Sequence, residues 1–101
     1  MILSPLRRTW GIKMEITDFC KSLDFMKLGQ AINRQNWQIA LNTVQRMQRQ
    51  SAETGDPIFD KNFTNLRHCL LHKDQLAAKN VLAVVIAKRA QILNHQEREE
   101  K

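Results

Sequence analysis

Glycine, proline and tyrosine are scarce in this chain of 101 residues. It contains 3 glycines, 2 prolines and no tyrosine, while 43% of its residues are apolar. So few turn-forming residues with so much apolar content are typical of a compact helical protein rather than a disordered one. The length fits one domain with a single modest core. No segment alternates apolar and polar residues with period two for long enough to predict a strand.

Cysteines and long apolar runs are scarce as well. Cys20 and Cys69 are too few and too far apart for a disulfide scaffold, so we expect two reduced thiols. The longest nearly apolar stretch, Val81–Ala87, is much shorter than the about 20 residues that a membrane-spanning helix needs. Because the first residues also show no export signal, we expect a cytoplasmic protein without a membrane segment.

The basic character of the chain is concentrated at its start. The net charge is +6, and half of it comes from Arg7, Arg8 and Lys13, which have no acidic neighbour between Met1 and Lys13. That stretch has no helical pattern and precedes a second methionine, Met14. We expect residues 1–13 to be a flexible basic leader that extends the chain upstream of a natural start at Met14; a disordered arm and a docking peptide are the alternatives. Residues 14–101 are expected to form the folded domain.

A pattern of apolar residues occurs twice along the chain, at a constant offset. Ser22–Met47 aligns with Asp60–Val85. The aligned identities are Phe25 with Phe63, Leu28 with Leu66, Ala40 with Ala78 and Asn42 with Asn80. A period of this size accommodates a two-helix unit, which cannot bury its apolar faces without a neighbour. The sequence therefore predicts an all-α four-helix bundle built from two repeated helical hairpins.

Cap and turn residues indicate where the helices begin and end. Ser22 is expected to cap the first helix, after a lead-in that is helical from Thr17 or Asp18, and Asn36 to cap the second. The second helix is predicted to run to about Ala52 and to end at Gly55.

The second hairpin is expected to start at Asp56-Pro57, as a cap followed by proline at the first helical position. A turn that leads to a cap at Asp60 is the alternative. Asp74 is predicted to cap the last helix, which is apolar almost all round from Leu76 to Ala87. Such a helix is either the centre of its bundle or part of an interface, so a homodimer is also expected.

No pattern in the sequence indicates catalysis. It contains no glycine-rich phosphate loop, no paired carboxylates and no cofactor motif, so we expect neither an enzyme nor a cofactor. His68 and His72 are four residues apart and share one helix face. Such a pair can hold a metal ion if a third ligand converges on it, but two exposed histidines are the interpretation that we favour.

The predicted second helix carries a polar face that is almost free of acidic residues. We predict that this face, together with the edge of the fourth helix, binds a partner protein. The candidate residues are Gln38, Asn42, Gln45, Arg46, Arg49, Val84 and Lys88. The sequence pI of about 9.8 also makes nucleic acid a candidate partner. The basic face would consist of Lys27, Arg34, Arg46 and Arg49 in the first hairpin and Lys88 and Arg89 in the second. No helix-turn-helix spacing or aromatic stacking pair supports such a partner, so we do not expect one.

Two families share parts of this pattern. Leu28–Met47, with the helix start Asn36-Trp37, resembles a tetratricopeptide-type hairpin, although the period of the repeat is longer than that of the family. Asn36–Leu93 resembles a histidine-phosphotransfer (Hpt) domain over a little more than half of the chain. The similar features are Trp37 at the start of a helix, the segment Phe63–Leu71, the turn His72–Asp74 and the long last helix Gln75–Leu93.

The Hpt resemblance implies a signalling role without the usual chemistry. Where those domains carry a phospho-accepting histidine, this chain has Val44–Met47, which contains none. The resemblance thus implies a bundle that docks a receiver domain but does not transfer phosphate by the usual route. We predict a non-catalytic protein–protein interaction module, such as a bacterial signalling adaptor. The alternatives are a phosphotransfer protein that uses His68 or His72 and a weak nucleic-acid-binding protein.

Overall fold

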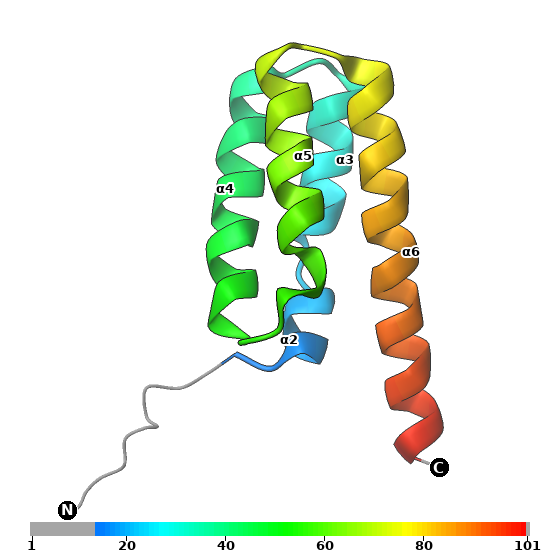
Figure 1. The fold of residues 1–101 in the computed structure, drawn as a ribbon. Helices are drawn as coiled ribbons and strands as arrows, with labels where there is room; N and C mark the ends of the chain where they lie inside the picture. Colours follow the sequence, from blue (N-terminus) through cyan, green and yellow to red (C-terminus); the bar gives the residue numbers. More distant parts are fainter. Residues whose placement is uncertain (1–13, 101) are drawn as a thin grey trace, which may run out of the picture.

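The computed structural model describes residues 14–100, with side chains as far as residue 95. The predicted leader, residues 1–13, lies outside the described residues. Within residues 14–100 the chain forms helices and no strand. In chain order these are α2 (Ile16–Cys20), α3 (Asp24–Asn33), α4 (Trp37–Glu53), the 3-10 helix η1 (Pro57–Phe59), α5 (Asp60–Leu71) and α6 (Gln75–Glu100). The predicted all-α four-helix bundle is confirmed (Figure 1).

The four long helices pack as a ring around one core. Each of α3, α4, α5 and α6 contacts the next, and α6 closes the ring against α3. Figure 1 shows α4 and α6 on opposite sides of the bundle, with α3 and α5 between them and α2 across the end nearest the amino terminus. Because α4 and α6 lie on opposite sides, their outward faces are separate surfaces.

The two hairpins repeat at the level of the backbone. Each turn between its helices contains one residue with positive φ, Gln35 at 59° and Lys73 at 56°, and these two residues are equivalent in the repeat. In both turns the next residue donates its backbone N–H to a carbonyl five residues earlier, at 2.8 Å in the first hairpin and 2.9 Å in the second. This hydrogen bond closes the carboxyl end of a helix. The predicted hairpin repeat is therefore confirmed.

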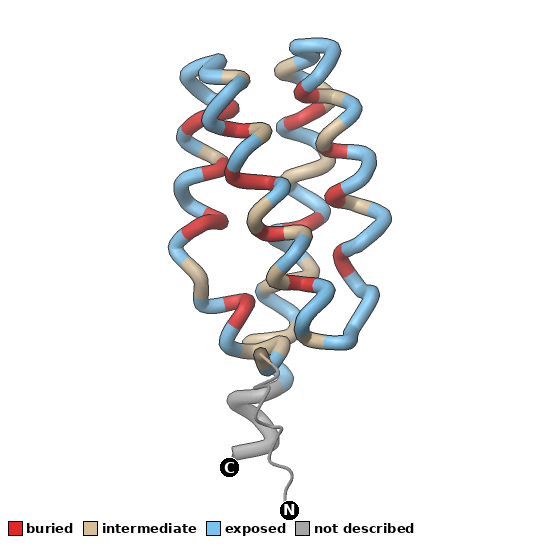
Figure 2. Tube along the Cα trace, turned by 90° about the vertical axis from the view of Figure 1, so that its left-hand side faces the viewer, coloured by how far each residue is buried: buried red, intermediate tan, exposed pale blue. Residues whose placement is uncertain are grey.

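The core consists of apolar side chains at equivalent positions of the two hairpins. Figure 2 shows these buried positions on the inward sides of the helices. The equivalent buried pairs are Phe25 with Phe63, Leu28 with Leu66, Ile32 with Leu70, Ala40 with Ala78 and Met47 with Val85, each at most 4% exposed. Burial of one apolar face per helix supplies the main driving force for folding.

All four phenylalanines of the chain gather at one end of the core. The cluster consists of Phe19, Phe25, Phe59 and Phe63, from α2, α3, η1 and α5. In five of the six pairs the ring centroids lie 5.3 to 6.2 Å apart. Edge-to-face and stacked arrangements of this kind add to the stabilisation from burial. The short helix α2, predicted as a helical lead-in, closes this end of the bundle with Phe19.

Three of the predicted start and stop residues act as expected. The Asp56 carboxylate accepts a hydrogen bond from the backbone N–H of Ile58 at 3.1 Å, with Pro57 in the first position of η1. The Asp74 carboxylate accepts one from the N–H of Ala77 at 3.1 Å. Gly55 follows α4 with φ of 74°, a conformation that glycine adopts without a steric penalty.

Two other cap predictions need correction. Asn36 does occupy the N-cap position of α4, as predicted. Its side chain, however, makes no capping hydrogen bond. The Ser22 hydroxyl accepts a hydrogen bond from the backbone N–H of Asp24 at 3.1 Å, and α3 begins at Asp24, so the helix starts two residues beyond Ser22.

Within residues 14–100, no helix combines the length and the apolar character that crossing a bilayer requires. The helix α6 has 26 residues, but its apolar run is followed by Lys88 and Arg89.

Candidate binding surface

The outward face of α4 carries a stripe of exposed polar side chains. Gln38, Asn42, Gln45 and Arg49 are three or four residues apart, so they line up on one side of the helix. The Gln38 amide donates a hydrogen bond to the Asn42 side chain at 3.1 Å. The only acidic residue of α4 is Glu53, at its last position. We call the four residues Gln38, Asn42, Gln45 and Arg49 the α4 stripe. They lie where neither α3 nor α5 covers the helix.

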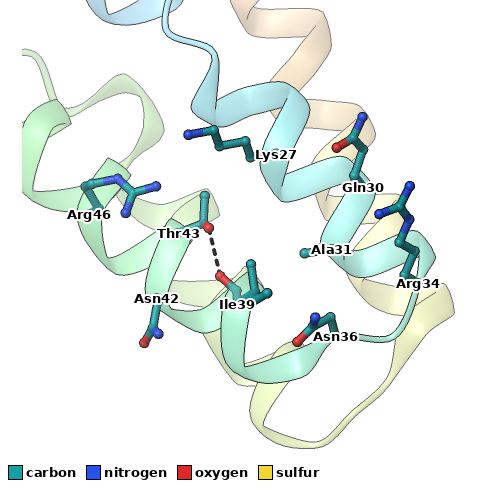
Figure 3. A pocket seen from close by; sticks show the side chains of 9 residues that line it. All are labelled: Lys27, Gln30, Ala31, Arg34, Asn36, Ile39, Asn42, Thr43 and Arg46. Atoms are coloured by element: carbon teal, nitrogen blue, oxygen red, sulfur yellow. Dashed lines mark hydrogen bonds between the residues drawn. The ribbon is translucent and has the colours of Figure 1, made fainter.

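Beside the stripe, a groove of about 440 Å³ separates α3 from α4 (Figure 3). Its lining residues are Lys27, Gln30, Ala31, Arg34, Asn36, Ile39, Asn42, Thr43 and Arg46. We call it the α3–α4 groove. Ala31 and Thr43 are buried at its base, and the Thr43 hydroxyl donates to the backbone carbonyl of Ile39 at 2.7 Å. Because these two side chains are small, the helices leave a hollow between them.

The α3–α4 groove is cationic. Lys27, Arg34 and Arg46 line it, and none of its lining residues is acidic. Arg46 forms a bidentate ion pair with the Asp24 carboxylate. Its Nε donates to one carboxylate oxygen at 3.0 Å, and a terminal guanidinium nitrogen donates to the other at 2.9 Å. Its hydrogen bonds hold the pKa of the Asp24 carboxyl below the ordinary value, and the charge of Lys27 acts in the same direction. Among the described residues, Lys27 and Arg34 form no ion pair with a carboxylate.

A second groove, between α4 and α5, is bridged by hydrogen bonds of the protein itself. The Gln48 amide donates to the Asp60 carboxylate and to the Thr64 hydroxyl, both at 3.2 Å. Its carbonyl accepts from Arg67 at 3.3 Å. The Nε of Arg67 has no hydrogen-bond partner in the described part of the chain but is buried, out of reach of a ligand. The carboxylate of Asp60 also lines this groove. The α4–α5 groove is therefore less suited to an anionic partner than the α3–α4 groove, which has no acidic lining residue.

The seven predicted partner-binding residues do not form one surface. Five lie on α4, where Arg46 is engaged with Asp24, but Val84 and Lys88 lie on α6, across the bundle (Figure 1). The Lys88 ammonium donates to the backbone carbonyl of Ile58 at 3.1 Å and to the Asn62 side chain at 2.7 Å. It therefore fastens η1 and α5 to α6. Val84 is 47% exposed on its helix.

The two candidate metal ligands, His68 and His72, are both exposed on α5 and at its carboxyl end. Among the described residues, no group of three histidine, cysteine, aspartate or glutamate side chains is placed to hold a metal ion. These residues therefore supply no third ligand to the histidine pair.

The cysteines show no sign of nucleophilic activation. Both are free; Cys20 is buried and Cys69 half-buried. Burial raises the pKa of the Cys20 thiol to about 11 and also raises the pKa of Cys69. A raised pKa keeps a thiol protonated at neutral pH, whereas a nucleophilic cysteine needs a lowered one.

Sequence reasoning missed Gln30 and Ile39 as residues of the candidate site. Ile39 is 51% exposed and lies outside the buried series Ala40, Val44 and Met47 of the same helix. An isoleucine out of phase with the buried face is a signal that the sequence does contain. The contribution of α3 was harder to foresee, because it depends on which side of that helix faces α4.

Comparison of the chain with family models, with curated proteins and with solved structures found no match. The resemblance to Hpt domains therefore remains a prediction from the sequence.

Proposed function

We propose that this protein is a non-catalytic interaction module that binds another protein through the α4 stripe and the adjoining α3–α4 groove. The observation that supports the proposal is the groove itself. It joins Lys27 of α3 and Arg34, at the carboxyl end of that helix, to a row of amides on α4. Neither cation forms an ion pair within the described residues. No other helix of the described chain covers this row.

The chemistry of the groove supports binding rather than catalysis. Its polar side chains are amides, one hydroxyl, one ammonium and two guanidinium groups. Amides donate and accept hydrogen bonds, and guanidinium groups hold carboxylates by two parallel bonds. None of the nine lining residues is an acid, a histidine or a cysteine, the side chains that most often move protons or attack substrates.

On the Hpt resemblance, the partner would be a receiver domain and the protein a bacterial signalling adaptor. That partner remains a prediction, since it depends on the resemblance alone. A protein partner of another kind would use the same surface.

The proposal is tested by affinity capture with the full chain as bait and nuclease-treated lysate of its native host as the source. The test variant replaces Gln38, Asn42 and Gln45 with alanine. The control variant replaces Lys79, Asn80 and Gln91, exposed residues of α6, in the same way. We expect one stoichiometric protein to stay on the wild type and on the control and to be lost from the test variant. Equal retention by all three baits would contradict the proposed surface.

A further inference from the structure

The cations of the α3–α4 groove are not required by the repeated fold. The offset of the repeat pairs Lys27 with Asn65, Arg34 with His72 and Arg46 with Val84. The second hairpin forms the same turn, with the same backbone hydrogen bonds, using these neutral or weakly basic residues. Arg46 pairs with Asp24 across the two helices, but helix pairing does not account for the positive charges of Lys27 and Arg34.

The positions of Lys27 and Arg34 fit two charges on one ligand. Lys27 lies in α3, and Arg34, seven residues later, is the residue that follows the carboxyl end of this helix. Seven residues of helix correspond to about two turns, or about 10 Å along the axis. Figure 3 shows the two residues towards opposite ends of the α3 side of the groove, with the Ile39 side chain directed from α4 towards Ala31 between them. With 51% of its surface exposed, Ile39 is an apolar contact between two cationic ones.

We propose, on the basis of the function proposed above, that the α3–α4 groove binds a helical segment of the partner that carries two carboxylates two turns apart and an apolar side chain between them. One carboxylate pairs with the Lys27 ammonium, and the other accepts two hydrogen bonds from the Arg34 guanidinium. The apolar side chain covers Ile39. A helix presents residues with this spacing on one face, and helix-in-groove binding is a common mode of recognition.

Several features favour an acidic protein segment over nucleic acid. None of the residues that line the groove is aromatic, so nothing in it stacks on bases as single-strand binders do. The Asp24 carboxylate, 2.9 Å from Arg46, already neutralises one of the three cations. Finally, the exposed Ile39 calls for an apolar partner, which a phosphate backbone does not supply.

The test measures binding of a designed peptide to the full chain by fluorescence polarisation at pH 7.5 and about 0.15 M salt. The peptide is a helix of about four turns, or about 14 residues, with two glutamates seven residues apart and a leucine four residues after the first. Binding of single-stranded DNA and of duplex DNA, each labelled with fluorescein, is measured in the same way for comparison. The test variant K27N/R34H brings in the residues of the second hairpin, so the repeat itself indicates that it folds; its circular dichroism and melting temperature are compared with those of the wild type.

The control variant is K61N/K79H, which removes the same charge from two exposed positions outside the groove. We expect the peptide to bind the wild type and the control equally, and K27N/R34H to bind at least about tenfold more weakly. A scrambled peptide of the same composition should also bind more weakly than the designed one. Equal weakening in the two variants would show non-specific charge attraction and overturn the proposal. So would absence of binding, or tighter binding of DNA that depends on Lys27 and Arg34.

Failure of this inference is distinguishable from failure of the proposed function. Suppose that the α4 stripe variant loses the partner captured from lysate while K27N/R34H retains it. This result would support the interaction module and contradict the proposal that its partner is an acidic helical segment. Retention of the partner by both variants would contradict both proposals.

Discussion

Ala40 and Ala78 occupy equivalent places in their hairpins and are both fully buried, whereas Arg46 and Val84, also equivalent, differ completely. Arg46 holds a carboxylate on α3, and Val84 leaves about half of its surface exposed. Inside the bundle, close packing restricts each position to residues of a certain size and polarity. At the surface packing imposes less, so matched positions can carry different residues with different contacts while the fold stays the same.

The outward faces of α4 and α6 differ in the same way. On α4 the exposed side chains are mostly polar, and Ile39 is the exposed large apolar residue of this helix. The exposed polar residues are Gln38, Asn42, Gln45, Arg49 and Glu53. On α6 the exposed large apolar residues are Leu76, Val84 and Ile86. The α4 side is the surface that we propose for a partner protein, and the α6 side is where the predicted homodimer would form.

The largest effect should come from the aromatic cluster, where the hairpins are alike. We expect Phe25→Ala and Phe63→Ala each to lower the free energy of unfolding by about 3–5 kcal/mol, because both remove a buried ring and leave a cavity. Urea unfolding of the wild type and of the two variants measures this loss of stability. A loss in one variant and little change in the other would show that the matched core positions are not equivalent.

The next effect tests the ion pair that only the first hairpin has. Arg46 lowers the pKa of Asp24, so the pair contributes stability that is fully present above the unfolded pKa of about 3.9 and is lost as the pH falls through the lower folded value. The double variant D24N/R46V brings in the equivalent residues of the second hairpin, Asn62 and Val84. We expect the melting temperature of the variant to fall less steeply below about pH 4 than that of the wild type. Parallel curves would rule out this contribution.

A smaller effect is expected at Val84, on the other side of the bundle. Because Val84 is 47% exposed, Val84→Glu should lower stability by no more than about 1 kcal/mol. If two copies meet at α6, the same change should separate them, since a buried, unpaired charge is costly. Sedimentation equilibrium of both proteins measures this, and a wild-type monomer would refute the predicted homodimer.

The smallest effect concerns Gly29, which lies in α3 where α5 has Arg67. A methyl group there would meet the Leu82 side chain at 3.7 Å, an ordinary contact. Gly29→Ala should therefore raise the free energy of unfolding by about 0.5–1 kcal/mol, by reducing the conformational freedom of the unfolded chain. Thermal melting measures the gain; a loss of stability would indicate that α3 and α6 need a closer approach than the structure has.

The fold was largely predictable because its determinants are local. Helix periodicity, the caps at Asp56 and Asp74 and the repeated Phe and Leu positions all act within a few residues or recur at one offset. The positive φ at Gln35 and Lys73 was not foreseen, because neither residue type favours that conformation.

The candidate site was predictable only in part. The stripe on α4 follows from helical spacing alone. Its combination with Lys27 and Arg34 depends on how α3 is rotated against α4, which core packing decides. The engagement of Lys88 with Ile58 and Asn62 likewise depends on residues far away in the sequence, so its internal role could not be inferred from its own segment.

The most direct test of the proposed binding surface is a titration of the ¹⁵N-labelled full chain with the acidic peptide, followed by amide chemical shifts. The account predicts that the shifts change along Lys27–Arg34 and Ile39–Arg46, and that the equivalent segments of the second hairpin, Asn65–His72 and Ala77–Val84, stay unchanged. Equal changes in both hairpins, or changes centred on α6, would contradict it.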